Sequence, residues 1–378
     1  MLSSCDESPS QIQNQIQKID LTKAIQKKVI INDFFDSVEY VKLETLPECL
    51  LDDDLQLFIT GEYILTYWFK GNIVYMFNRK NGDFIKQISR SGQGPGEYHH
   101  AIIGEFDVKN KILFFDKIKN WMGVNLETNE LTYINKPNLP DNNKYFMPPI
   151  SGFSLIEDDL FISFVNNVSG NDSIKLVLFD RNGTILKTFP NYQTYIDHDQ
   201  SHTPYSKGEF YNFNGSLFFK ESKYNDTIFK VNADTLIPQY SFFLGEKQPP
   251  YHLRESKDFD IQNYYSVSLT GESERFVFFN YYLKRKKYFC YFDKADSKTV
   301  VCDNEKQMNG FVDEIDERLI FFPNGMTNEG ELFGIISAEN ISNYINNNED
   351  LKMKSEFSNL LNIKSDDNPI IIITKQKK

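Results

Sequence analysis

The chain has 378 residues and a formal net charge of −12, and 40% of its residues are apolar. The negative charge argues against a nucleic-acid-binding protein, which needs a basic face for phosphates. No apolar run approaches the roughly 18 residues that a membrane-spanning helix needs. Aromatic residues make up 15% of the chain, with 33 Phe and 21 Tyr, and favour a strand-rich fold with a large core.

The N-terminal segment predicts a lipid-anchored tether. Leu2-Ser3-Ser4-Cys5 resembles a bacterial lipobox, in which small residues precede the cysteine that is lipidated. A chance cysteine in a disordered tail is the alternative. Residues 6–28 are polar and rich in Gln. We therefore interpret residues 1–28 as a flexible tether and residues 29–378 as the folded domain.

Three further cysteines, Cys49, Cys290 and Cys302, cannot all pair with one another. Cys290 and Cys302 flank a predicted turn at residues 293–298, so a disulfide between them remains open. We favour the interpretation that both are unpaired, small hydrophobic residues of the core.

A repeated unit organises the rest of the chain. After a first alternating strand at residues 38–44, each unit has an apolar strand that ends in a polar marker residue, a short turn and a second strand. An Asx side chain caps its own turn, which indicates a β-hairpin. The markers are spaced roughly 45 to 60 residues apart, as propeller blades are: Asn78, Asn125, Asp180, Asn232, Asp293 and Ser337.

The repeat predicts a six-bladed β-propeller of four-stranded antiparallel blades. Two further strand candidates precede the hairpins, such as residues 55–58 with 63–68 and 209–213 with 216–220. Six units of four strands fill a propeller. The apolar run Ile370–Thr374 is a final strand, and we expect it to pair with residues 38–44 and close the ring. Helical segments are predicted at residues 340–348 and 356–361.

The stretch Gly92-Gln93-Gly94-Pro95-Gly96 cannot continue a helix or a strand, because proline lacks the N–H and glycine favours turns. It therefore predicts a tight crossing between two parts of the sheet structure, with a structural role.

The sequence resembles the six-bladed β-propeller lipoproteins of Bacteroides-group bacteria over about residues 30–376. Three strings carry the resemblance: Val38–Thr45, Ile88–Tyr98 and Asp367-Asn368-Pro369. The resemblance implies the propeller fold and a location in the cell envelope as an outer-membrane lipoprotein anchored at Cys5. It implies little about chemistry, because a fold does not determine a function.

Propeller topology predicts that the blade-to-blade loops gather at one face, around the central channel. Tyr and His side chains offer flat apolar surfaces with polar tips, which suit sugar rings or peptides. Arg90 has the chemistry to bind a carboxylate or sulfate. The alternative is that long surface loops simply collect these residue types. The predicted ligand-binding residues are Arg90, Glu97, Tyr98, His99, His100, His198, His202, His252 and Arg254.

No motif indicates a catalytic centre or a cofactor. A Gly-x-Ser-x-Gly elbow and a phosphate-binding glycine loop are both absent from the sequence. His198 and His202 have the spacing of a zinc pair, but Pro204 favours a loop, and we predict no metal. Trp68 and Trp121 are expected in the core.

We predict a monomer that binds a carbohydrate, glycopeptide or envelope protein without catalysis. A hydrolase or lyase with its site at the channel mouth remains an alternative, as does a structural subunit of an outer-membrane complex.

Overall fold

The protein is described by a computed structural model, which covers residues 16–52, 55–68, 73–92, 97–98, 103–117, 119–139, 150, 152–196, 206–254, 256, 259–303, 309–314, 319–348, 350–351 and 355–377. For residues 68, 89–91, 98, 103–104 and 355–356 only the backbone is described.

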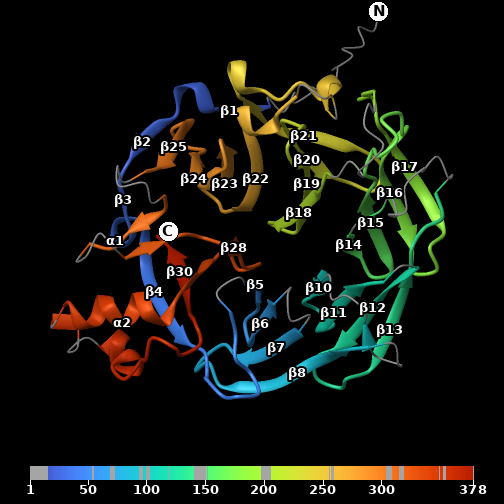
Figure 1. The fold of residues 1–378 in the computed structure, drawn as a ribbon. Helices are drawn as coiled ribbons and strands as arrows, with labels where there is room; N and C mark the ends of the chain where they lie inside the picture. The colour runs from blue at the N-terminus through green and yellow to red at the C-terminus, as the bar shows by residue number, and fades with distance from the viewer. Residues whose placement is uncertain are drawn as a thin grey trace, which may run out of the picture.

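Seven sheets form a ring about a central axis, with the first strand of most blades innermost (Figure 1). Blade 1 contains β5 (Leu55–Ile59), β6 (Tyr63–Trp68), β7 (Ile73–Asn78) and β8 (Phe84–Ser91), with β9 (Glu97–Tyr98) parallel to β8 at its outer edge. Blade 2 contains β10 (Ile103–Asp107), β11 (Ile112–Asp116), β12 (Asn120–Asn125) and β13 (Leu131–Asn135). Blade 3 contains β14 (Ser154–Glu157), β15 (Leu160–Phe164), β16 (Ile174–Asp180) and β17 (Ile185–Pro190).

Blades 4 and 5 continue the same order. Blade 4 contains β18 (Gly208–Phe213), β19 (Ser216–Glu221), β20 (Thr227–Val231) and β21 (Leu236–Phe243). Short 3₁₀ helices lead to the next blade: η2 (Gly245–Lys247), η3 (Tyr251–Leu253) and η4 (Ile261–Asn263). Blade 5 contains β22 (Ser266–Glu272), β23 (Phe276–Leu283), β24 (Lys286–Asp293) and β25 (Lys298–Cys302).

Blade 6 is much smaller than its neighbours. From the inside outwards it contains β27 (Ile320–Phe321), β26 (Phe311–Val312) and β3 (Val29–Ile30). Blade 7 contains β28 (Gly325–Met326), β29 (Leu332–Ile336), β30 (Ile370–Gln376) and β4 (Phe35–Lys42). Between β29 and β30 the chain forms α2 (Ala338–Asn346) and η6 (Ser355–Leu360), close to the two predicted helical segments.

The prediction of six blades is therefore wrong, although the propeller and its four-stranded blades are present. The six marker residues belong to blades 1–5 and blade 7. Blade 6 escaped the repeat pattern because its strands have two residues each, too few to show a period. Its third strand, β3, comes from the distant N-terminal segment.

The N-terminal segment runs around the outside of the ring (Figure 1). β1 (Gln17–Asp20) and β2 (Ile25–Lys27) pair in parallel with β21 and β25, and η1 (Leu21–Lys23) lies between them. α1 (Ile31–Phe34) then leads from β3 to β4. Ile19 is fully buried. Residues 17–20 and 25–27, which we predicted as part of the tether, are thus strands on blades 4 and 5. Cys5 lies outside the described residues.

The two predicted partners near the termini do pair: β4 and β30 are antiparallel, with Val38 opposite Thr374. Asn368 explains why the Asp-Asn-Pro string precedes β30. Its side-chain amide donates to the carbonyls of Glu44 (2.7 Å) and Cys49 (2.9 Å), and its oxygen accepts the Leu51 N–H (2.9 Å). One buried side chain therefore fixes the chain that follows β4 against the chain that precedes β30.

The core lies between neighbouring blades. Strands in the middle of a blade are covered on both faces, which explains continuous apolar runs such as β7 and β16 instead of alternation. Trp121 is fully buried between blades 2 and 3, as predicted. Cys290 and Cys302 belong to different core clusters on the two sides of blade 5. Both are free thiols, which confirms the favoured interpretation.

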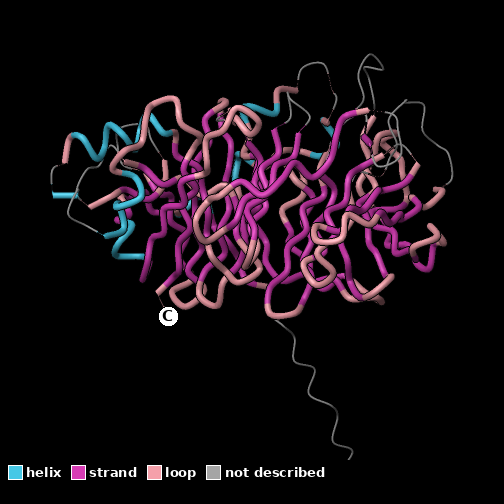
Figure 2. Tube along the Cα trace, turned by 90° about the horizontal axis from the view of Figure 1, so that it is seen from below, coloured by secondary structure: helices cyan, strands magenta, loops and turns pink. Residues whose placement is uncertain are grey.

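The ring is a flat disc whose connections lie on two faces (Figure 2). We call one of them the loop face: it carries the connections between blades and the turns between the second and third strands. The described start of the glycine-rich stretch is at the outer edge of blade 1, where a Cβ at Gly92 would overlap the Glu97 carboxylate. None of the described helices is long and apolar enough to span a membrane.

Candidate functional site

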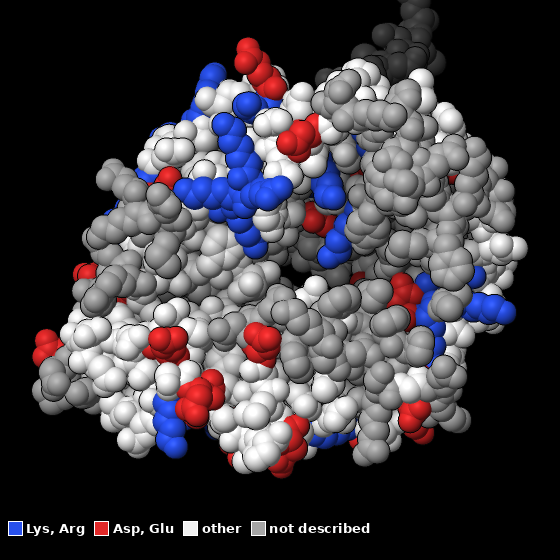
Figure 3. Space-filling model, viewed as in Figure 1, with Lys and Arg blue, Asp and Glu red and all other residues white. Residues whose placement is uncertain are grey.

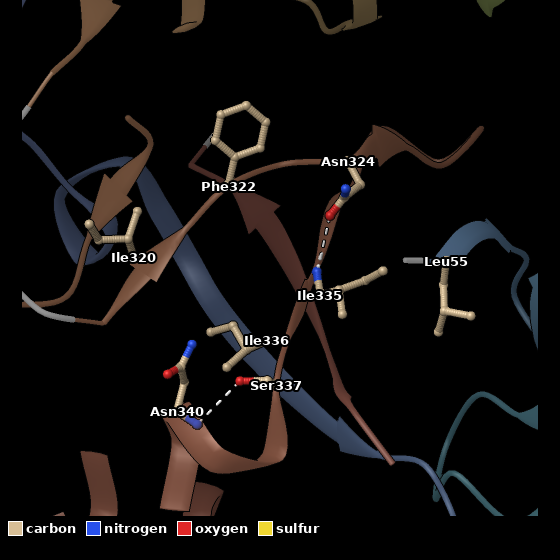
Figure 4. Close-up of a pocket in the computed structure, with 8 residues that line it drawn as sticks. All are labelled: Leu55, Ile320, Phe322, Asn324, Ile335, Ile336, Ser337 and Asn340. Atoms are coloured by element: carbon tan, nitrogen blue, oxygen red, sulfur yellow. Dashed lines mark hydrogen bonds between the residues drawn. The ribbon is translucent and has the colours of Figure 1, made fainter. Parts of the chain in front are cut away.

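A cavity of about 390 Å³ opens on the loop face between blades 6, 7 and 1 (Figure 4). The start of β5 and the end of β29 meet there, together with the connection from β27 to β28 and the first turn of α2. The lining residues are Leu55, Ile320, Phe322, Asn324, Ile335, Ile336, Ser337 and Asn340.

Local hydrogen bonds fix the polar groups of this cavity. The Ser337 hydroxyl accepts the Asn340 N–H (3.3 Å), so a serine N-cap starts α2 at the cavity wall. The Asn324 carboxamide oxygen accepts the Ile335 N–H (3.1 Å) beyond the short β28–β29 ladder. Figure 4 shows Asn324 and Asn340 on opposite sides of the space.

The position of Phe322 depends on a glycine in the neighbouring strand. A Cβ at Gly334 would lie 2.5 Å from the Phe322 carbonyl oxygen, so only glycine lets the β27–β28 connection pack this closely on β29. The Phe322 ring, partly buried, then forms one wall of the cavity.

The chemistry of the lining suits binding more than catalysis. Isoleucine and phenylalanine side chains give apolar walls, while two carboxamides and one hydroxyl offer hydrogen bonds. This combination matches a molecule with an apolar face and several hydroxyl or amide groups. None of the eight described lining side chains is titratable, so the described part of the cavity wall supplies no general acid or base.

Most of the predicted site residues are not at this cavity. The Arg90 backbone lies in β8, away from the central axis, and Glu97 is partly buried at the outer edge of blade 1. His252 is exposed in η3. The Tyr98 side chain and all of His99, His100, His198 and His202 lie outside what the structure describes.

Arg254 is fully buried between blades 3 and 4. Its guanidinium lies 4.9 to 5.9 Å from the ring centres of three tyrosines, Tyr195, Tyr224 and Tyr251. Its Nη1 is 3.9 Å from the Glu221 carboxylate, which also binds the Lys175 ammonium at 2.5 Å. We call these six residues the Arg254 cluster.

The Arg254 cluster connects several segments of the loop face, and its guanidinium is fully buried. Burial and the nearby Glu221 charge raise the pKa of Tyr251 to about 12. The Tyr195 hydroxyl donates to the Asn167 carbonyl (2.7 Å), and Asn167 donates to the Tyr251 hydroxyl (3.2 Å). These contacts join the β15–β16 turn to the long connections after β17 and β21, so the cluster acts as a framework for the loops.

Two carboxyl groups on innermost strands stand apart from the cavity. Burial raises the pKa of Glu105, on β10, from its ordinary value of 4.5 to about 7. Burial also raises the pKa of Glu209, on β18, although the charges of Lys220 and Lys207 oppose the shift. The Glu209 carboxylate accepts the Leu269 N–H of the next blade at 2.9 Å.

Sequence reasoning missed Phe322, Asn324 and Asn340. Phe322-Pro323-Asn324-Gly325 carries a turn signal, and it can be interpreted as a blade-to-blade connection only once blade 6 is recognised.

A second cavity, of about 330 Å³, lies between β4 and the β7–β8 turn. Most of its lining residues are polar, among them the ion pair of Lys42 with Asp367. Among the described residues no group of three or more His, Cys, Asp or Glu could hold a metal ion.

Comparison with known proteins identifies the fold but no activity. A family model described as a domain of unknown function (DUF4934) matches residues 16–375. The crystal structure of a Bacteroides fragilis protein, inferred to be exported, has a TM-score of 0.71 at 18% identity, over 96% of this chain and 100% of that one. A DUF4221 member from Bacteroides vulgatus has a TM-score of 0.52 at 12% identity, over 91% and 97%. No curated protein matches the chain.

Proposed function

The chain belongs to this family of domains of unknown function, and we propose that it binds a ligand without catalysis, at the cavity on its loop face. The ligand class is a carbohydrate, glycopeptide or protein segment. The observation that supports this most is the lining of the cavity: apolar walls with two carboxamides and a hydroxyl, and no titratable side chain among the lining residues that the structure describes.

We also propose that the protein works in the cell envelope, held by a lipid on Cys5. The Bacteroides fragilis neighbour is inferred to be exported, and the lipobox-like string supports the same location for this chain. The test is metabolic labelling with an alkyne fatty acid in a Bacteroides host that expresses the gene from its native locus. Labelling that disappears in Cys5→Ala supports the anchor, and an unlabelled protein contradicts it.

The binding proposal is tested by thermal shift with neutral oligosaccharides, acidic oligosaccharides, peptidoglycan fragments and peptides. A ligand that binds only the folded state raises the midpoint by an amount set by its concentration and affinity. We expect one class to give a shift that Phe322→Ala and Asn340→Ala both abolish. Asn343→Ala is the matched control, because Asn343 is exposed on the same helix but does not line the cavity.

The alternative is a hydrolase or lyase that works at the mouth of the central channel. The pKa of Glu105, raised to about 7, favours it, since a carboxyl that keeps its proton near neutral pH can act as a general acid; burial raises the pKa of Glu209 in the same direction. The assay is release of new reducing ends or unsaturated products from glycans. Activity that is lost in Glu209→Gln and kept in Asn340→Ala would replace binding by catalysis as the function.

A further inference from the structure

A basic hairpin lies beside the cavity on the loop face. Lys284 and Arg285 form the turn between β23 and β24, and Lys286 and Lys287 begin β24. Four consecutive cations are notable in a chain with a net charge of −12. Figure 3 shows Lys and Arg side chains gathered on this face over the position of β23 and β24 in Figure 1.

The hairpin turn is held in place. Lys284 and Arg285 both have positive φ, 49° and 63°, as a two-residue hairpin turn requires. Gln262 in η4 fixes the turn from outside: its carbonyl accepts the Lys284 N–H (2.8 Å), and its side-chain oxygen accepts the Arg285 Nε–H (2.8 Å). The cations therefore project from a prearranged backbone, which lowers the entropy lost when a ligand binds.

Lys287 connects the hairpin to the cavity. Its ammonium lies 4.4 Å from the centre of the Phe322 ring, which lines the cavity, and 5.8 Å from the Tyr282 ring. Burial lowers the pKa of Lys287, because the ammonium has lost part of its hydration. Lys286 lies over Tyr288 at 5.1 Å. Aromatic faces and cations thus alternate from the turn to the cavity.

The described carboxylates do not neutralise the cations of the hairpin by ion pairing. Within the described part of the chain, none of its four cations forms an ion pair with a carboxylate, whereas the less exposed Lys136, Lys175 and Lys294 each do so. The nearby Glu209 accepts a backbone hydrogen bond and lies beside Lys220. The hairpin therefore presents net positive charge to a ligand.

We propose that the ligand of this site is an acidic glycan, whose carboxylate or sulfate groups bind the Lys284–Lys287 hairpin while a sugar unit occupies the cavity. This inference rests on the proposed binding function and specifies its ligand. The exposed ring of Tyr282 offers a flat face for a sugar. The negative charge of the rest of the molecule disfavours a long polyanion such as a nucleic acid, which would meet repulsion beyond the hairpin.

Calorimetric titration tests the inference with three probes of matched length: oligogalacturonate for carboxylates, a chondroitin sulfate oligosaccharide for sulfates, and a neutral xylo-oligosaccharide. The hairpin variant is Lys284→Gln/Arg285→Gln/Lys286→Gln. Its control is Lys80→Gln/Lys109→Gln/Lys298→Gln, which removes three exposed cations from the opposite face. Unfolding midpoints of both variants establish that each is folded.

At least one acidic probe should bind the wild type more tightly than the neutral probe does. The hairpin variant should bind that acidic probe about tenfold or more weakly than the wild type, whereas the control variant should bind it as tightly as the wild type. Raising the NaCl concentration from 50 to 500 mM should also weaken binding of the acidic probe to the wild type, because salt screens the charges. Three results overturn the inference: neutral and acidic probes that bind alike, acidic binding equal in the two variants, or equally tight binding of a DNA oligonucleotide. After either of the first two results, the proposed binding function still holds if Phe322→Ala abolishes binding. If no probe binds at all, both the acidic-glycan inference and the proposed binding function are overturned.

Discussion

Arg254 shows how a side chain in a long polar loop can be misjudged from sequence. Its position in a long predicted blade-to-blade loop suggested a ligand-binding residue, but three tyrosines from three segments cover it completely. Its partner Glu221 and the preceding residue Lys220 are consecutive at the end of β19, and both side chains are buried. Buried charges on a strand resemble solvent-exposed ones in sequence, because only distant segments neutralise them.

Glu221→Gln should destabilise the protein strongly. The neutral amide would leave two buried cations, Lys175 and Arg254, without their shared counter-charge, a change that costs about 3–5 kcal/mol. Urea unfolding measures the loss. The matched control is Glu127→Gln, whose carboxylate pairs with Lys111 at the surface and should cost about 1 kcal/mol or less. Equal, small losses would show that the Arg254 cluster is not a buried framework.

Glu105 predicts a specific pH dependence. Since burial raises its pKa from 4.5 to about 7, the folded state keeps a proton that the unfolded state releases between these values. Its contribution to stability therefore falls as pH rises through that window. Glu105→Gln should raise the free energy of unfolding at pH 8 more than at pH 4.5. Glu339→Gln, on the exposed side of α2, is the control; the same pH profile in wild type and Glu105→Gln would contradict the burial of this carboxyl.

At the scale of elements, the N-terminal strands differ most from expectation. Residues 17–27 have a polar composition that favours a tether, yet β1 and β2 gain hydrogen bonds from the open edges of β21 and β25. An edge strand needs few apolar residues, since backbone pairing supplies most of its contacts. In contrast, strands of blades 1–5 are long enough for their apolar runs and Asx turns to be recognised.

Two isoleucines of this segment provide a test. Ile19 in β1 is fully buried against blade 4, whereas Ile25 in β2 is 48% exposed. Ile19→Ala should lower the free energy of unfolding by about 2–5 kcal/mol, because it leaves a cavity in the core. Ile25→Ala should change it by about 0.5 kcal/mol or less. If both substitutions were neutral, residues 17–27 would behave as the predicted tether.

For the whole molecule, the period of the repeat was sufficient to predict a propeller but not its blade count. The period depends on hairpins, and blade 6 has only two-residue strands completed by β3 from the other end of the chain. The same omission hid the cavity, because its residues lie in the connection from blade 6 to blade 7 and at the start of α2. That the blade-to-blade loops form the binding face stays a prediction; which segments form a cavity depends on packing between distant parts of the chain.

Hydrogen–deuterium exchange with and without a bound oligosaccharide locates the ligand on the protein surface without any substitution. If the ligand binds at the cavity and the basic hairpin, exchange slows in residues 320–326, 335–340 and 282–288, with little change in the β7–β8 and β24–β25 turns of the opposite face. Protection confined to η3 and the Arg254 cluster, or to the opposite face, would contradict binding at the cavity.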